Sequence, residues 1–132
     1  MVRMLYAVIG AVLAALIAMP SFAAPSDDIN CEALDTLGQA GQNVCAYRDV
    51  EASQHSLDVR LRALLATHSG LRNYVKASQK AWIAYRNAQC ALESTDMEGG
   101  SAQGEYYNHC VAMKNRARMD DLDPDKWIVA NP

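Results

Sequence analysis

The chain has 132 residues, with 12 Lys and Arg against 15 Asp and Glu, which gives a net charge of −3. A length of this order supports one domain and only a modest hydrophobic core. The negative charge makes nucleic acid a poor partner, so nucleic-acid binding is excluded as a leading function.

Residues 1–23 have the pattern of a secretory signal peptide. A basic residue, Arg3, precedes an apolar run, and the small residues Ser21 and Ala23 lead to a predicted cleavage site after Ala23. The apolar run of about 16 residues is shorter than the roughly 20 needed to span a bilayer, so a retained anchor is disfavoured. We therefore expect one exported domain at residues 24–132, periplasmic or secreted, with no stable membrane insertion after cleavage.

The first part of the exported chain, residues 25–43, mixes Pro, Asp, Asn and Gly with a few apolar residues. This composition predicts an arm with a short helix over Glu32–Leu37. A turn is expected around Gly38 and Gly41.

A helical period begins at Val44 and predicts a first long helix that ends near His68–Gly70. Its predicted inner face consists of Tyr47, Val50, Gln54, Leu57, Leu61 and Leu64. A second long helix of about 24 residues follows. Its predicted inner face contains Leu71, Tyr74, Val75, Ser78, Trp82, Tyr85, Gln89 and Leu92.

The adjacent Gly99 and Gly100 predict a turn after the second helix. Ser101 or a neighbour is expected to cap a third long helix, which should end before Pro124. The predicted inner face of this helix consists of Tyr106, Cys110, Met113 and Ala117.

Short connections between successive helices favour antiparallel neighbours, so the predicted fold is all-α: a small antiparallel bundle of three long helices plus the N-terminal arm. All four cysteines lie in the exported part and no two form a C-x-x-C pair, which favours two disulfides over a metal site. Cys90 and Cys110 stand at similar distances from the Gly99 turn and should therefore pair across it. Cys31 would then pair with Cys45.

The sequence shows no constellation typical of an enzyme. Nucleophile, phosphate-loop, zinc and haem motifs are missing, and the three histidines are isolated, so we expect no catalytic residues, no metal and no cofactor. Four acids, Glu93, Asp96, Glu98 and Glu105, lie between Arg86 and Lys114 without a Lys or Arg among them. This negative stretch suits a basic partner better than acid–base catalysis.

The segment from Ser78 to Cys90 resembles a family signature. It contains Trp82, Tyr85 and Arg86 in the spacing W-x-x-Y-R-x-x-x-C, which is similar to the LprI-type lysozyme-inhibitor family. Cys45-Ala46-Tyr47-Arg48 and the Gly-rich segment before Cys110 resemble two further blocks of that family, so the resemblance covers residues 31–122. It implies an exported helical domain that binds and inhibits lysozyme.

A loop mechanism is the finer hypothesis. Lysozyme cuts glycan with two carboxylates in a cleft, and the acidic Gly-rich loop could occlude that cleft. The residues expected to bind lysozyme, or another basic protein, are Asp96, Glu98, Gly99, Gly100, Ser101 and Gln103. The alternative is a structural or protein-interaction module of the cell envelope that does not inhibit lysozyme.

Overall fold

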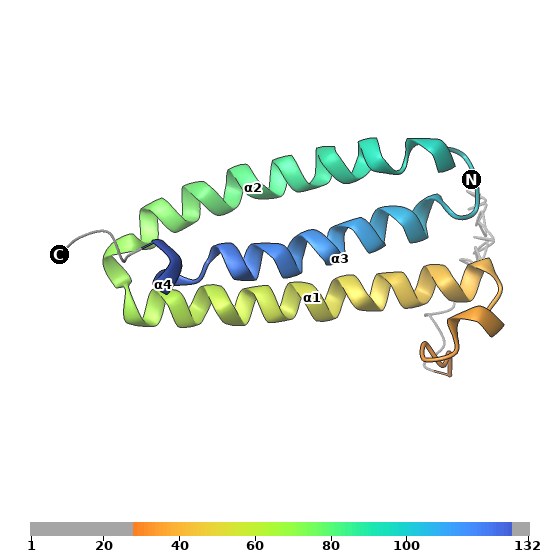
Figure 1. Ribbon diagram of the computed structural model, residues 1–132, viewed down its shortest axis with the longest axis horizontal. Coiled ribbons are helices and arrows are strands. Elements are labelled where there is room, and N and C mark those ends of the chain that lie inside the picture. Colours follow the sequence, from red (N-terminus) through yellow and green to blue (C-terminus); the bar gives the residue numbers. More distant parts are fainter. Residues whose placement is uncertain (1–27, 128–132) are drawn as a thin grey trace, which may run out of the picture.

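The computed structural model describes residues 28–127, which form the predicted bundle of three long helices (Figure 1). The predicted signal peptide at residues 1–23 lies outside the described residues. The long helices are α1 (Gln39–Thr67), α2 (Arg72–Glu93) and α3 (Gln103–Asp121). The shorter elements are η1 (Leu34–Thr36), η2 (Ser69–Leu71), η3 (Thr95–Met97) and α4 (Pro124–Trp127). Within residues 28–127, none of the helices has both the length and the hydropathy required to cross a bilayer.

The helices run up, down and up, so α2 is antiparallel to both of its companions while α1 and α3 are parallel (Figure 1). Contacts between α1 and α3 confirm this register along the bundle. Gln39 is bonded to Glu105 at one end and Ser53 to Asn115 in the middle, and at the other end Arg60 is bonded to Asp123, two residues after α3. The short connections predicted from the sequence thus produce the expected antiparallel order.

Helix α1 starts five residues earlier than the predicted Val44. Gly38 has an extended backbone and precedes the helix, whereas Gly41 lies inside the first turn, so the predicted turn is wrong at Gly41. A single glycine costs a helix only about 1 kcal/mol. A Cβ at Gly41 would lie 3.1 Å from the Cβ of Leu37, which shows how closely the arm packs there.

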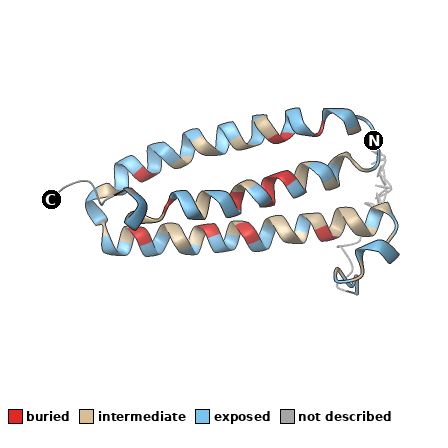
Figure 2. Ribbon diagram, in the orientation of Figure 1, coloured by how far each residue is buried: buried red, intermediate tan, exposed pale blue. Residues whose placement is uncertain are grey.

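Buried residues occur on all three long helices (Figure 2), and the apolar ones form two clusters. One consists of Leu57, Leu64, Val75 and Leu122, with Leu61, Leu65, Leu71, Trp82 and Met119 packed against it. The other is smaller and consists of Cys90, Cys110 and Val111, with Val50 and Tyr107 against it. The large apolar cluster therefore lies at the end where α1 turns into α2, and the small one lies toward the α2–α3 loop.

Several predicted inner-face residues are instead exposed. They are Tyr47 on α1, Tyr74, Tyr85 and Leu92 on α2, and Tyr106 and Met113 on α3. On α3 the buried stripe is displaced by about one residue, or 100°, from the predicted one, and it includes Val111, Ala112 and Asn115. The prediction failed because polar side chains occupy inner positions of all three helices.

Both predicted disulfides are present. Cys31 and Cys45 join the arm to α1, with Cα atoms 5.5 Å apart, and Cys90 and Cys110 join α2 to α3, with Cα atoms 5.6 Å apart. Cys90 is fully buried and Cys110 nearly so. The second bridge is therefore part of the core, whereas the first joins the buried Cys45 of α1 to the partly buried Cys31 of the arm.

Candidate functional site

The connection between α2 and α3 is a structured loop. Gly99 has a φ of 74°, a left-handed backbone conformation that side chains other than glycine rarely adopt. Its N–H donates a hydrogen bond of 3.1 Å to Oε1 of Gln103. A Cβ on Gly100 would lie 3.1 Å from the carbonyl oxygen of Met97, so this position is also tight. Both glycines predicted to form the turn are thus required by its shape.

The loop is also fastened to α1. The side-chain amide of Asn43 donates to the carbonyl oxygen of Ser101 at 2.9 Å, and Nε2 of Gln39 donates to Oε2 of Glu105 at 2.7 Å. The predicted cap by Ser101 or a neighbour is right in position only, because the neighbouring Ala102 occupies the N-cap of α3 and no side-chain cap bond is made. These bonds hold the loop against the start of α1.

Most of the predicted partner-binding residues are exposed, and one of them instead stabilises the loop. Asp96, Glu98, Gly99, Gly100 and Ser101 are exposed, whereas Gln103 is partly buried and stabilises the turn through Gly99. The side chains of Asp96 and Glu98 make no ion pair with any residue in the described part of the chain. The structure thus leaves two uncompensated carboxylates on a rigid loop.

The loop belongs to a larger acidic region, which we call the loop end: residues 28–47 and 87–113. The loop end contains seven Asp and Glu residues and no Lys or Arg. One of these acids, Glu93, is bonded to Lys114 at 3.3 Å. Hydrogen bonds from Gln89 and Lys114 lower the pKa of Glu93 below its ordinary value. The arm and the α2–α3 loop therefore present one negative surface.

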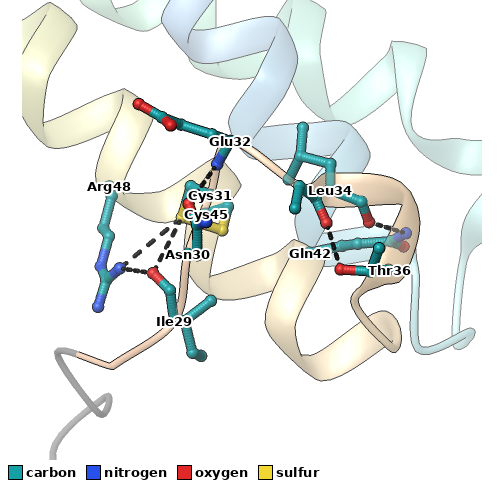
Figure 3. Close-up of a disulfide and its surroundings, with 10 residues drawn as sticks. Ile29, Asn30, Cys31, Glu32, Leu34, Thr36, Gln42, Cys45 and Arg48 are labelled. Atoms are coloured by element: carbon teal, nitrogen blue, oxygen red, sulfur yellow. Dashed lines mark hydrogen bonds between the residues drawn. A yellow bond between two sulfur atoms is a disulfide. The ribbon is translucent and has the colours of Figure 1, made fainter.

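A cavity of about 610 Å³ lies between the arm, α1 and α3. Figure 3 shows how the arm is held there: the Cys31–Cys45 bridge lies next to Arg48, whose Nη1 donates to the carbonyl oxygen of Ile29 at 2.9 Å. Glu32, Glu105 and His109 contribute to its wall. Sequence reasoning missed this cavity because it depends on how the arm folds back, which no residue pattern encodes.

The side chains of the signature residues Trp82 and Arg86 are partly buried between the helices. Nη1 of Arg86 donates to Oδ1 of the fully buried Asn115 at 2.7 Å and to Oε1 of Gln54 at 3.1 Å. Asn115 in turn donates to Ser53 at 3.0 Å. This polar layer, formed by Ser53, Gln54, Arg86 and Asn115, connects all three long helices.

Burial lowers the pKa of Arg86 through desolvation, and the guanidinium has no carboxylate partner among residues 28–127. Its charge is stabilised by amide oxygens and by the indole of Trp82, whose ring centre lies 5.1 Å away. Arg118 lies 5.6 Å from the same ring. Trp82 is partly buried between two cations, whereas Tyr85 is 56% exposed. Trp82 and Arg86 therefore connect the helices to one another. Of the three signature residues, only Tyr85 is exposed enough to contact a partner.

The described part of the chain holds no group of three or more His, Cys, Asp or Glu side chains placed to bind a metal ion. The arrangement of charges and the fixed loop are features of a binding surface. In chemical terms this surface can attract a cation-rich partner.

Comparison with known proteins agrees with the resemblance in the sequence. The model of the family described as "Lysozyme inhibitor LprI" matches residues 31–122. An uncharacterised protein of Rhizobium meliloti (strain 1021) is 34% identical over 76 residues, which cover 58% of this chain and 55% of that protein. The chain thus spans about half the length of this relative. No solved structure matches.

Proposed function

Because the chain belongs to the lysozyme inhibitor LprI family, we propose that it is an exported protein that binds lysozyme and inhibits it by occluding the active-site cleft. The loop from Asp96 to Gln103 is the proposed inserting element. The proposal depends chiefly on one observation: this loop connects two helices at an end of the bundle where residues 28–47 and 87–113 contain seven acids and no Lys or Arg, with Arg48 and Lys114 at the border.

Charge supports the choice of surface. Lysozymes of the common animal type are basic, and an acidic surface accelerates encounter with such a partner. The loop contributes two exposed carboxylates, Asp96 and Glu98, which are free to meet the basic rim of the cleft.

Rigidity supports the same choice. A loop that already has its bound shape loses little conformational entropy on binding. Gly99 and Gly100 set the turn, and the bonds from Gln39 and Asn43 of α1 hold its base. The small exposed residues at its tip allow close approach of the backbone to a cleft.

The predicted export also supports the proposal, because it would bring the protein to the compartment in which it can meet lysozyme. Two disulfides are typical of oxidising compartments such as the periplasm or the cell exterior, where lysozyme acts. We therefore place the function outside the cytoplasm, in agreement with the signal-peptide pattern.

The test compares two charge reversals of the same kind. Glu98→Lys alters the loop, while Glu51→Lys alters an exposed acid on α1 outside the loop end. We expect Glu98→Lys to raise the inhibition constant for lysozyme about fivefold at low salt, with a smaller effect at higher salt, because exposed charges are worth up to about 1 kcal/mol and are screened. Glu51→Lys should stay within about twofold of the parent.

A second variant separates contact from folding. The side chain of Ser101 makes no cap bond, so Ser101→Ala should leave the melting temperature unchanged while it weakens inhibition if the hydroxyl enters the cleft. Equal inhibition by the parent and all three variants would place the contact surface elsewhere. A purified oxidised protein that does not inhibit lysozyme would favour the cell-envelope interaction module instead.

A further inference from the structure

A groove lies between α1 and α2, far along the bundle from the acidic loop. Its volume is about 480 Å³. Four apolar side chains line it: Leu61, Leu65, Val75 and Ile83. Val75 is buried and belongs to the core cluster, whereas Ile83 is 38% exposed. An apolar surface of the bundle therefore remains open to a ligand here.

Three cations form one wall of this groove. Arg72, Lys76 and Lys80 follow one another at four-residue intervals on α2 and so share a face of the helix. All three are exposed. No hydrogen bond or ion pair connects any of them to another residue of the described chain, and no Asp or Glu lines the groove. Their positive charges are left without compensation beside an apolar floor.

The volume and length of the groove indicate what kind of ligand it can bind. A volume of about 480 Å³ is in the range of small-molecule sites. The α2 wall from Arg72 to Ile83 is about 16 Å long at 1.5 Å per residue. These dimensions suit a single extended hydrocarbon chain, with the charge of its head group placed among the cations.

We propose that this groove binds a fatty acid in its carboxylate form, with a hydrocarbon chain about as long as that of dodecanoate. The hydrocarbon chain lies on Leu61, Leu65, Val75 and Ile83, and the carboxylate is held by the cations of α2. A basic protein is repelled by this wall, so the groove is separate from the proposed lysozyme surface. A second copy placed symmetrically on the groove would bring two sets of these cations together, which disfavours self-association.

Dodecanoate, used below its micelle concentration, is the test ligand for the full oxidised domain. Calorimetric titration should show binding, and amide chemical shifts should change along the groove. Dodecyltrimethylammonium has the same chain with a cationic head, and we expect it to bind at least tenfold more weakly. The double variant Lys76→Gln with Lys80→Gln should weaken dodecanoate binding about tenfold, because it removes two of the three head-group partners.

Two further variants give the controls. Ile83→Gln should weaken binding of dodecanoate by removing apolar contact, without an effect on the melting temperature, since the side chain is partly exposed. Lys126→Gln removes an exposed cation of α4 that does not line the groove, and should bind like the parent. Lysozyme inhibition should be the same for all of these variants.

Four outcomes would overturn the proposal. The first is no binding of dodecanoate, and the second is equal binding of the anionic and cationic amphiphiles. The third is a dimer in sedimentation analysis that Ile83→Gln dissociates, which would assign the groove to a second copy. The fourth is binding to phosphatidylglycerol vesicles with no binding of monomeric dodecanoate, which would assign this face to a membrane surface.

Discussion

At the loop end of the bundle the chain is held by covalent bonds, whereas the opposite end is held by apolar packing. Both disulfides lie at the loop end, where the Cys90–Cys110 bridge itself supplies two of the three residues of the small buried cluster. The opposite end, which we call the core end, comprises residues 57–86 and 114–127 and contains the larger cluster around Leu57. The two ends differ in charge as well, because the core end has ten Lys and Arg against five Asp and Glu.

The difference between the loop end and the core end shows how a small domain can carry a strongly charged surface. The excess of acids at the loop end adds negative charge that does not favour a compact fold. Disulfides stabilise a fold without requiring a large apolar core, so they suit an end of the bundle that has many charged residues on its surface. The core end has no such bridge and depends on its packed leucines.

The largest expected effect is at the core end. Leu57 is fully buried, and Leu57→Ala should lower the free energy of unfolding by about 2 to 5 kcal/mol through lost burial and a residual cavity. Urea unfolding measures this, with Leu92→Ala as the control, since Leu92 is 64% exposed. A loss below that of Leu92→Ala would show that the core end does not depend on this cluster.

The next effect is at the loop end. Replacement of Cys90 and Cys110 by Ala should cost about 3 kcal/mol, because the bridge closes a loop of about 20 residues and its sulfurs are buried. Replacement of Cys31 and Cys45 should cost less, since that bridge holds an arm outside the bundle. Urea unfolding of both double variants gives the comparison. Equal losses would mean that the arm is as much a part of the cooperative unit as the helices.

A smaller effect is expected in the polar layer, whose Arg86 and Asn115 lie where the core end borders the loop end. Arg86→Met should cost about 1 to 3 kcal/mol, because the buried Oδ1 of Asn115 loses its donor. The neighbouring Tyr85→Ala should change stability by less than about 0.5 kcal/mol. Adding Asn115→Leu to Arg86→Met should restore part of the loss, since both polar partners are then removed. If the double variant is less stable than Arg86→Met, the layer is held by packing and not by these bonds.

The smallest effect concerns pH. Hydrogen bonds from Gln89 and Lys114 lower the pKa of Glu93 in the folded protein, so the unfolded chain binds a proton there more readily. The resulting stabilisation is present above the ordinary carboxylate pKa and is lost as the pH falls through the lowered value. Glu93→Gln should therefore reduce stability slightly at pH 7 and by less at pH 3 in urea unfolding. An equal reduction at both pH values would show that the variant loses stability through altered side-chain contacts and not through the lost charge of Glu93.

The architecture could be predicted from the sequence because it depends on local signals. Helical periods, the two glycines at residues 99 and 100, and the spacing of Cys90 and Cys110 around them sufficed for the bundle and both disulfides. The early start of α1 and the short α4 were not predicted, since Gly41 is tolerated in a helix and Pro124 is the first residue of one.

The inner faces and the groove could not be predicted from apolar residues alone. Arg86 and Asn115 occupy positions that a hydrophobic pattern assigns to solvent, and their burial is tolerated only because each finds a partner on another helix. The loop residues were predicted to bind a partner, and the structure adds that Gln103 supports the turn. The groove arises from the separation of α1 and α2 around Leu61 and Ile83, which is a property of packing.

The separation of charge along the bundle also makes the molecule an electric dipole whose axis follows the helices. A dipole near a charged body experiences a torque, so it rotates before contact as well as accelerating toward it. Near a cationic protein the dipole orients the α2–α3 loop toward that protein. Near an anionic surface it orients the cations of α2 toward that surface. The orientation of each encounter is thus selected over distances set by the Debye length, about 8 Å at physiological salt, before any side chain touches its partner.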